Sequence, residues 1–297
     1  MSDIRRCGLI TRFADDRVSE SALVLAAHLR ARGLAVLAPE DERERLGLEN
    51  VQFVDDETLA READLMIAIG GDGTLLYAAR LVAARGTPLL GINRGRLGFL
   101  TDIMPDDMLS GVDAALSGQC LRDERQLLRA ELHRRADGAV LQGLALNDVV
   151  LQTSKSGQLI DYDTWIDGHF VNSHGGDGLV VASATGSTAY ALSCGGPIVE
   201  PSLEVMVITP ICPHTLSDRP IVVSARSRIE LELVERPEAH AEVTCDGRVL
   251  GRLPPGDRLI ITTQEKRITL LHPEGYDYFR LLRSKLNWGR RSFDLAR

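Results

Sequence analysis

Apolar and polar positions follow two alternating patterns in the first third of the chain. Short, fully apolar runs predict buried strands, and the segments between them carry apolar residues at helical spacing. The predicted strands span 7–10, 34–37, 65–69 and 88–92, and the predicted helices span 19–32, 74–85 and 105–116. Strands that alternate with helices are typical of a parallel sheet covered by helices. We therefore expect residues 1–122 to form an α/β domain with a Rossmann-like parallel sheet.

After about residue 122 the pattern changes to successive strands separated by turn signals. The predicted strands span 126–134, 139–152, 159–171, 179–183, 205–208, 229–234, 259–263 and 268–271. Asp167-Gly168 is a typical hairpin turn. We expect residues 123–270 to form a β-rich, sandwich-like domain with one short helix after Gly186. Residues 271–297 are expected to form a helical tail.

Composition and charge narrow the class of protein. The 297 residues carry 34 Lys and Arg against 42 Asp and Glu, a net charge of -8, and aromatic residues make up only 4%. An acidic chain is a poor binder of nucleic-acid backbone, and no apolar run approaches the roughly 20 residues of a membrane helix. The N-terminus lacks the apolar stretch of a secretory signal. We expect an aliphatic core and no nucleic-acid or membrane partner.

Cysteine and histidine usage bears on metal binding and location. The five cysteines are scattered without a C-x-x-C pair, and the seven histidines are dispersed without an H-E-x-x-H motif. This usage argues against a thiolate zinc site and suits a reducing compartment. We expect a cytoplasmic protein without a metal site built from its own side chains.

The most informative segment is Gly70-Gly71-Asp72-Gly73-Thr74, between a predicted strand and a predicted helix. Glycine permits close approach of backbone to a ligand, and the N–H groups at a helix start bind phosphate. The segment matches neither the Walker A loop nor the dinucleotide fingerprint. Two like charges about 4 Å apart repel by about 4 kcal/mol near a protein surface, so Asp72 indicates a bound Mg²⁺ or a proton-transfer role. The alternative is a tight turn in which Asp72 caps the helix.

A polar pair, Asn147-Asp148, interrupts the apolar run 145–151. Inside a strand such a pair indicates a sheet edge or a ligand contact, and the alternative is a bulge or a solvent-facing pair. Three further segments rich in glycine and small polar residues, 91–102, 176–178 and 185–197, are either turns or ligand loops. The residues alone leave these alternatives open.

Taken together, these segments resemble one family, the bacterial NAD kinases. The matches follow the family's order from about residue 65 to residue 290, at 70–74, 91–102, 145–151, 177–179, 185–197, 213–220, 245–247 and 272–279. The G-G-D-G segment alone is shared with diacylglycerol-kinase-like lipid kinases and phosphofructokinases. The complete set is therefore the more specific signal.

The resemblance implies that the 2′-hydroxyl of the adenosine ribose of NAD attacks the γ-phosphate of ATP, giving NADP and ADP. It also implies that the last helix returns to the first domain. Asp72 matches the residue assigned as proton acceptor, and Asn147 with Asp148 matches the pair that holds the adenosine. The remaining substrate or nucleotide positions implied by the resemblance are Gly70, Gly71, Gly73, Thr74, Gln158, Gly175, Asp177, Thr188, Ala189, Tyr190, Ala191, Leu192, Ser193 and Arg248.

The resemblance further implies a homo-oligomer, a dimer or a tetramer. A divalent cation, Mg²⁺, is expected to bind through the phosphates of ATP rather than through protein ligands. The sequence departs from the family pattern in three places: Asp148 stands where Glu is commoner, Ser183-Ala184-Thr185 replaces Thr-Pro-Thr, and Arg248 replaces Gln. Gly175 lies where many members carry a basic side chain near the nicotinamide end of the ligand.

Two other functions compete with an NAD kinase. A lipid or sugar kinase would share the G-G-D-G segment, but Asn147-Asp148 and the segment 185–197 argue against it. A nucleotide-binding sensor without catalysis would not need Asp72.

Overall fold

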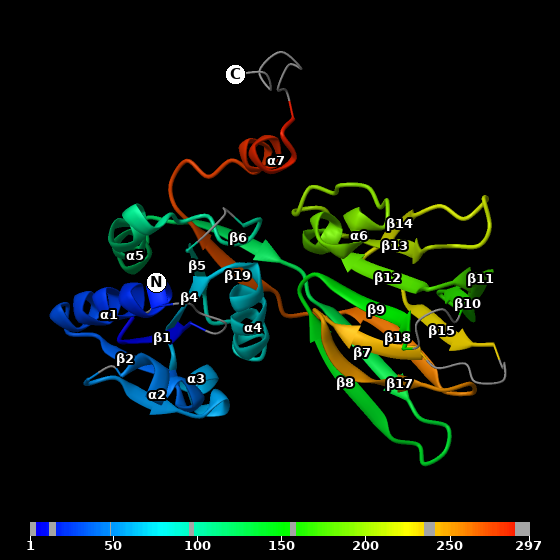
Figure 1. Cartoon of the computed structure of the whole chain (residues 1–297), viewed down its shortest axis with the longest axis horizontal. Helices are drawn as coiled ribbons and strands as arrows, with labels where there is room; N and C mark the ends of the chain where they lie inside the picture. Colours follow the sequence, from blue (N-terminus) through cyan, green and yellow to red (C-terminus); the bar gives the residue numbers. More distant parts are fainter. Residues whose placement is uncertain are drawn as a thin grey trace. The chain divides into compact units, whose positions relative to one another are not determined.

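The computed structural model describes residues 4–11, 16–47, 49–94, 98–154, 159–234 and 241–288. The chain divides into two units, one formed by Met1–Asp123 with Thr269–Arg297 and the other by Glu124–Ile268 (Figure 1). Within the described ranges, no helix combines the length and the apolar character that a membrane span requires.

The first unit is built on a seven-stranded sheet of order β3-β2-β1-β4-β5-β19-β6. Its pairs from β3 through to β19 are parallel, which confirms the expected α/β architecture. The elements are β1 Arg6–Ile10, α1 Asp16–Ala31, β2 Ala35–Pro39, α2 Arg43–Leu46, β3 Gln52–Val54, α3 Asp56–Glu62, β4 Leu65–Gly70, α4 Asp72–Val82, β5 Leu89–Asn93, α5 Met108–Ser117, β6 Leu121–Arg125, β19 Ile268–His272 and α7 Tyr278–Leu286.

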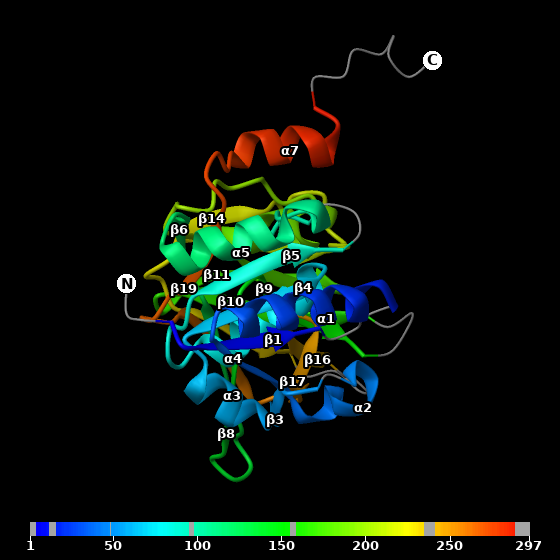
Figure 2. The same ribbon diagram turned by 90° about the vertical axis from the view of Figure 1, so that its left-hand side faces the viewer.

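Helices α1 and α5 cover one face of this sheet (Figure 2). Val18, Ala22, Leu25 and Leu29 recur every three or four residues along α1 and join one hydrophobic cluster with strand residues such as Leu9. Helix α4 packs against β4 and β5. The parallel register places the ends of β4 and β5 side by side, so the loops that follow these two strands begin at the same sheet edge.

The second unit contains two six-stranded sheets, of order β11-β10-β15-β18-β7-β8 and β14-β13-β12-β9-β16-β17. One hydrophobic cluster takes side chains from both sheets, among them Leu132 and Leu231 from the first and Leu151 and Leu179 from the second. The expected β-rich domain is therefore confirmed. Its strands are β7 Leu128–His133, β8 Val140–Ala145, β9 Asp148–Thr153, β10 Ile160–Ile166, β11 His169–Gly176, β12 Gly178–Ser183, β13 Val205–Ile211, β14 Ile221–Ser224, β15 Ile229–Leu233, β16 Ala241–Cys245, β17 Arg248–Leu253 and β18 Arg258–Thr263.

The predicted single strand 139–152 is wrong, because the chain changes sheets within it. β8 pairs with β7 in one sheet, whereas β9 pairs with β12 and β16 in the other. The interruption falls at Leu146 and Asn147, and Asp148 begins β9. Asp148 is only 6% exposed and begins a central strand, so it is neither at a sheet edge nor solvent-facing, and Asn147 before it is half-buried.

Several short elements carry no apolar pattern and were not expected. β6 reads Leu-Arg-Asp-Glu-Arg and is mostly exposed at the edge of its sheet, and β3 has no fully buried residue. The predicted strand 268–271 does form, as β19, but it pairs with β5 in the sheet of the first unit. An apolar run shows that a strand is buried without showing which sheet it joins.

Candidate functional site

The glycine-rich loop lies where β4 ends at Gly70 and α4 begins at Asp72. A β-carbon at Gly70 would lie 3.0 Å from Cβ of Thr74, so packing within the loop requires this glycine. A β-carbon at Gly71 or Gly73 would meet no described atom within 4 Å. Protein packing therefore does not explain the glycines at 71 and 73, whereas close approach of a ligand to the backbone would.

Asp72 directs its carboxylate toward the loop that follows β5 rather than toward its own helix. Oδ2 accepts from the backbone N–H of Phe99 at 2.9 Å, and Oδ1 accepts from those of Leu100 at 3.1 Å and Thr101 at 3.3 Å. The hydroxyl of Thr101 also donates to Oδ1, at 3.3 Å. The N-cap of α4 is Gly71 and has no side-chain cap bond. The alternative in which Asp72 caps its helix is therefore wrong.

The loop after β5 is folded back on that strand by a second set of bonds. Asn93, 1% exposed, donates from Nδ2 to Oγ1 of Thr101 at 2.9 Å, and its backbone N–H donates to the carbonyl of Ile103 at 2.8 Å. The central part of the segment 91–102, residues 95–97, lies outside the described residues. Asn93 and Asp72 together fix the position of Thr101.

Asp246 clamps the interruption between β8 and β9. Its carboxylate accepts from the backbone N–H groups of Leu146 at 2.7 Å, Asn147 at 2.8 Å and Asp148 at 3.1 Å. Its own N–H donates to the carbonyl of Asp148 at 3.0 Å. From the other side Ser183 donates its hydroxyl to the carbonyl of Leu146 and its N–H to that of Asn147. The polar pair is thus held at the point where the chain changes sheets.

Asp246 is the residue that the sequence did not identify. Asp246-Gly247 forms the turn between β16 and β17, with φ values of 47° and 74° that suit this pair of residues. The sequence therefore indicates a turn and gives no sign that the carboxylate reaches residues about a hundred positions earlier. A second Asp-Gly turn, Asp167-Gly168, has similar φ values of 52° and 79° and confirms the predicted hairpin between β10 and β11.

Burial and a neighbouring carboxylate shift the ionisation of Asp148. Burial, and to a smaller extent the charge of Asp246, raise the pKa of Asp148 to about 7, against the lowering effect of a hydrogen bond from the backbone N–H of Tyr190. Burial also raises the pKa of Asp246, whereas the N–H groups of 146–148 lower it. Near neutral pH the Asp148 carboxyl is therefore partly protonated, and a ligand that binds its ionised form changes this balance.

The segment after β12 places the next group of predicted residues beside this pair. A β-carbon at Gly186 would lie 2.7 Å from Cα of Asn147, so only glycine allows the approach. Thr188 ends a short 3₁₀ helix, Thr185–Thr188, and α6 spans Tyr190–Ser193. Gly186 packs on Asn147 and the backbone N–H of Tyr190 bonds the Asp148 carboxylate, so the segment that holds six of the predicted residues begins beside the polar pair. These six residues are Thr188, Ala189, Tyr190, Ala191, Leu192 and Ser193.

Asp177 joins the same cluster through a cysteine. It lies between β11 and β12, and its side chain hydrogen-bonds the thiol of Cys212. Burial, Cys194, Cys212 and Asp177 together raise the pKa of the Tyr190 hydroxyl.

The remaining predicted positions are less closely tied to this cluster. Gly175 lies in β11 opposite Asp161, and a β-carbon there would lie 2.9 Å from Oδ1 of that residue. Arg248 is exposed at the start of β17. Gln158 lies outside the described residues. Among the residues that the structure describes, no three His, Cys, Asp or Glu side chains are grouped closely enough to hold a metal ion.

Comparison with known proteins assigns both units to one family. The family model described as the ATP-NAD kinase N-terminal domain matches residues 8–120, and that of the ATP-NAD kinase C-terminal domain matches residues 146–272. A protein named NAD kinase from Thiobacillus denitrificans is 48% identical over 284 residues, 96% of this chain and 97% of its own. One from Pseudomonas putida strain W619 is 43% identical over 98% of both chains.

Solved structures agree with this assignment. An NAD kinase from Archaeoglobus fulgidus in complex with ATP superposes with a TM-score of 0.73 at 27% identity, covering 95% of this chain and 98% of its own. The yeast NADH kinase complexed with NADH shares the fold, with a TM-score of 0.91 over 98% of this chain and 90% of its own at 24% identity. The resemblance read from the motifs is confirmed, and the chain belongs to the NAD kinase family, a family of phosphotransferase enzymes.

Proposed function

We propose that this chain transfers the γ-phosphate of ATP to the 2′-hydroxyl of the adenosine ribose of NAD. The observation that supports the proposal is that one chain of this family contains two local arrangements of residues suited to the two substrates. The first is a carboxylate beside a helix N-terminus with two glycines that packing does not require. The second is a buried polar pair clamped where β8 meets β9.

The loop at the start of α4 would bind phosphate. Helix α4 has 11 residues, and the N–H groups of its first turn are oriented outward with partial positive charge. The open space at Gly71 and Gly73 lets phosphate oxygens reach these groups. This local field offsets the net charge of -8 that would otherwise repel a polyphosphate.

Asp72 would act as general base in this reaction. A carboxylate offers about four acceptor positions, and among the described residues Oδ2 accepts only from Phe99. The free position on Oδ2 would accept the proton of the 2′-hydroxyl. As that proton leaves, the ribose oxygen bonds to the γ-phosphorus, the bond from the γ-phosphorus to the bridging oxygen breaks, and ADP departs. The bonds from 99–101 hold the carboxylate still, which reduces the reorganisation that the transfer requires.

Asn147 and Asp148 would hold the adenosine. The ionised carboxyl of Asp148 accepts hydrogen bonds from ribose hydroxyls, and the amide of Asn147 can donate and accept at the edge of the base. A divalent cation would be held mainly by the phosphates of ATP, since Mg²⁺ binds through phosphates and retains its waters. When bound, it neutralises charge on the transferring phosphoryl group.

We also propose that the chain works as a homo-oligomer in the cytoplasm. The resemblance to the family supports the oligomer. The five cysteines are all free thiols, which supports a reducing compartment.

The test is a coupled assay that follows NADP formed from ATP and NAD. It is expected to show turnover that EDTA abolishes and Mg²⁺ restores. Turnover of a diacylglycerol or a sugar phosphate with no turnover of NAD would replace the proposal with the lipid or sugar kinase reading. Binding of NAD without any phosphoryl transfer would replace it with a sensor.

A further inference from the structure

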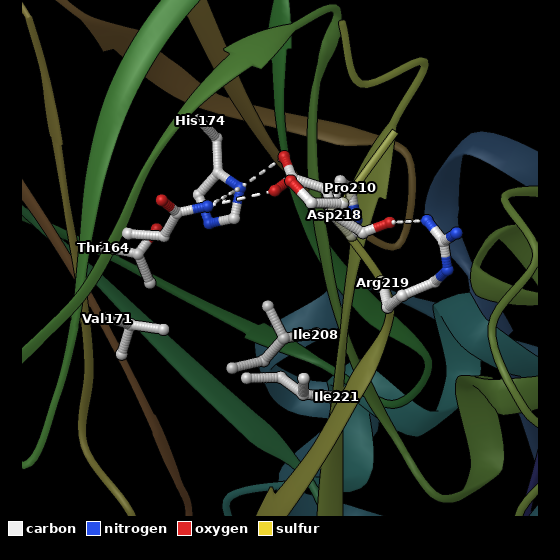
Figure 3. Close-up of a pocket in the computed structure, with 10 residues that line it drawn as sticks. Thr164, Val171, His174, Ile208, Pro210, Asp218, Arg219 and Ile221 are labelled. Atoms are coloured by element: carbon white, nitrogen blue, oxygen red, sulfur yellow. Dashed lines mark hydrogen bonds and ion pairs between the residues drawn. The ribbon is translucent and has the colours of Figure 1, made fainter. Parts of the chain in front are cut away.

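A cavity of about 280 Å³ in the second unit is lined by none of the residues assigned above to NAD or ATP. Its walls come from β10, β11, β13, β14 and the segment 217–219 (Figure 3). β11 and β14 are edge strands of different sheets. The cavity therefore lies at the edge of the core between the two sheets, where a ligand can enter from solvent.

One part of the cavity is apolar. Val171, Ile208, Pro210 and Ile221 line it, and Figure 3 shows Ile208 and Ile221 across from Val171. Ordered water suits such walls poorly, because a buried water needs roughly two to four polar partners. The walls suit the flat faces of a small ring.

Thr164 brings an unpaired hydroxyl into this cavity. The inward positions of β10 are Ile160, Tyr162 and Thr164, and Thr164 is 1% exposed. In the described part of the chain its Oγ1 has no hydrogen-bond partner. A buried polar group without a partner destabilises the folded protein, because it has lost its bonds to water and gained none in return. A ligand that hydrogen-bonds this hydroxyl would offset this destabilisation.

His174 brings a ring nitrogen to the same wall. Its Nδ1 lies 3.0 Å from Oδ2 of Asp218, whose side chain is 4% exposed and also accepts from Nδ2 of Asn172 at 3.0 Å. Nδ1 is thus occupied by the carboxylate, and Nε2 is the ring nitrogen left to hydrogen-bond a ligand. No residue within the described ranges bonds Nε2.

A single polar group of a ligand can reach both Thr164 and His174. Thr164 pairs with Asn172 and Tyr162 with His174 in the β10–β11 register. Thr164 and His174 are therefore diagonal neighbours on one sheet face, about 7–8 Å apart along the backbone. A carboxamide carries a donor and an acceptor on one carbon, which spans this separation through two hydrogen bonds.

We propose that this cavity binds a single-ring carboxamide without negative charge. The amide N–H donates to Nε2 of His174, the amide oxygen accepts from the Thr164 hydroxyl, and the ring packs between the apolar walls. Asp218 disfavours an anion, and the guanidinium of Arg219, which also lines the cavity, donates to the backbone carbonyls of Leu216 and Asp218. The ring is that of a free aromatic carboxamide, because Gly175, where the family resemblance places the nicotinamide, faces the opposite side of the β10–β11 pair. The nicotinamide end of the dinucleotide is the alternative source that the kinetic test below distinguishes, and it rests on the proposed function.

Binding of benzamide and of free nicotinamide to the full chain, followed by amide chemical shifts, tests the site without any assay of activity. Both probes are expected to saturate at millimolar concentration with shifts in β10 and β11. Benzoate, which has the same shape with a negative charge and no N–H donor, is expected to bind at least about tenfold more weakly, the equivalent of one lost hydrogen bond.

Two variants and one control locate the binding. Thr164→Val keeps the shape of the side chain and is expected to weaken benzamide about tenfold, with a melting temperature equal to or above that of the wild type. Val171→Trp blocks the mouth and is expected to abolish binding. Phe170→Trp is the matched control, because Phe170 packs on Trp165 and does not line the cavity. It is expected to bind like the wild type.

The KM for NAD of Val171→Trp shows which molecule supplies the bound carboxamide. An increase assigns the site to the dinucleotide, and no change assigns it to a free molecule. The proposal is overturned if the wild type shows no saturable amide binding, or if Thr164→Val and Val171→Trp bind benzamide as the wild type does.

Discussion

A β-carbon at position 98 would lie 2.8 Å from Cγ of Asp72, so the proposed catalytic carboxylate fits only against a glycine. The same β-carbon would also crowd the hydroxyl of Thr101, which donates to Asp72. Position 98 therefore controls the geometry of position 72 from 26 residues away along the chain.

Gly98→Ala is expected to displace the Asp72 carboxylate. Overpacking of a tight site costs about 1–3 kcal/mol in unfolding free energy, and the kcat of phosphoryl transfer is expected to fall because the base is misplaced. Gly73→Ala is the matched comparison, since its added methyl meets no described atom. It is expected to keep or raise the melting temperature, as alanine favours helix by about 0.5–1 kcal/mol, while the KM for ATP rises. Equal kcat in wild type and Gly98→Ala would contradict the proposed link.

Asp72→Asn is expected to bind NAD with similar affinity and to turn over at least about a hundredfold more slowly. The amide cannot accept the proton of the 2′-hydroxyl. The substitution also replaces one of the two oxygens that accept from the N–H groups of 99–101 with an NH₂ group, so the loop loses part of its anchorage. The thermal stability of the variant is therefore measured together with its kinetics. Turnover near that of the wild type in a folded variant would remove Asp72 from the role of base.

Asp246→Asn is expected to raise the KM for NAD more than it lowers kcat. The amide loses one of the two acceptor oxygens that hold the N–H groups of 146–148, so Asn147 and Asp148 become less well positioned. The KM for ATP is expected to stay unchanged. Asp167→Asn is the matched control, because Asp167 occupies the other Asp-Gly turn and accepts from the N–H of Arg228. If both variants affect the KM for NAD alike, the effect belongs to the turns and not to the clamp.

The raised pKa of Asp148 predicts how stability depends on pH. Its pKa is about 7 in the folded protein against an ordinary value of 3.8. The contribution of Asp148 to the free energy of unfolding is therefore fully present below about pH 4 and is lost as pH rises through 7. Asp148→Asn cannot ionise, so it is expected to be more stable than the wild type at pH 8 by up to about 4 kcal/mol and nearly equal at low pH. Urea unfolding at several pH values measures this difference. If the free energies of unfolding of the two proteins differed by the same amount at every pH, Asp148 would not be the titrating group.

The absence of a side chain at Gly175 predicts weak discrimination between NAD and NADH. The family resemblance places this position near the nicotinamide ring, which is cationic when oxidised and neutral when reduced. A hundredfold preference requires about 2.7 kcal/mol of differential stabilisation, for which a bare backbone is a poor source. The measurement is kcat/KM for both dinucleotides. A preference above about a hundredfold would contradict the prediction, and Arg248→Gln would then test whether Arg248 supplies the charge.

The first unit was largely predictable because its signals are local. A buried strand, two glycines and an amphipathic helix follow one another within residues 65–82, and that order places Asp72 at the start of α4. The partners of Asp72 were not predictable, since they lie 27 to 29 residues later in a loop without a periodic pattern. Short polar strands such as β6 were not predicted either, because their sequences have no periodic apolar pattern.

The second unit shows a different limit. The run 139–152 reads as one strand because apolar residues occur in both halves, although β8 is mostly exposed and β9 is mostly buried. The change of sheet depends on pairing with β7, β12 and β16, which no short window contains. The role of Asp246 likewise depends on a turn that closes about a hundred residues after the segment it holds.

If Asn147 and Asp148 hold the adenosine as proposed, the change of sheets at Leu146 and Asn147 makes substrate affinity depend on how firmly the two sheets of the second unit pack together. A defect far from any ligand that lets the two sheets shift relative to each other would strain this crossing first, since one continuous stretch of backbone belongs to both. Weakened NAD binding would then accompany only a modest loss of overall stability. In hydrogen exchange, the amides of 146–148 would be released before those in the middle of β9, which makes this crossing an early reporter of loosening in the unit.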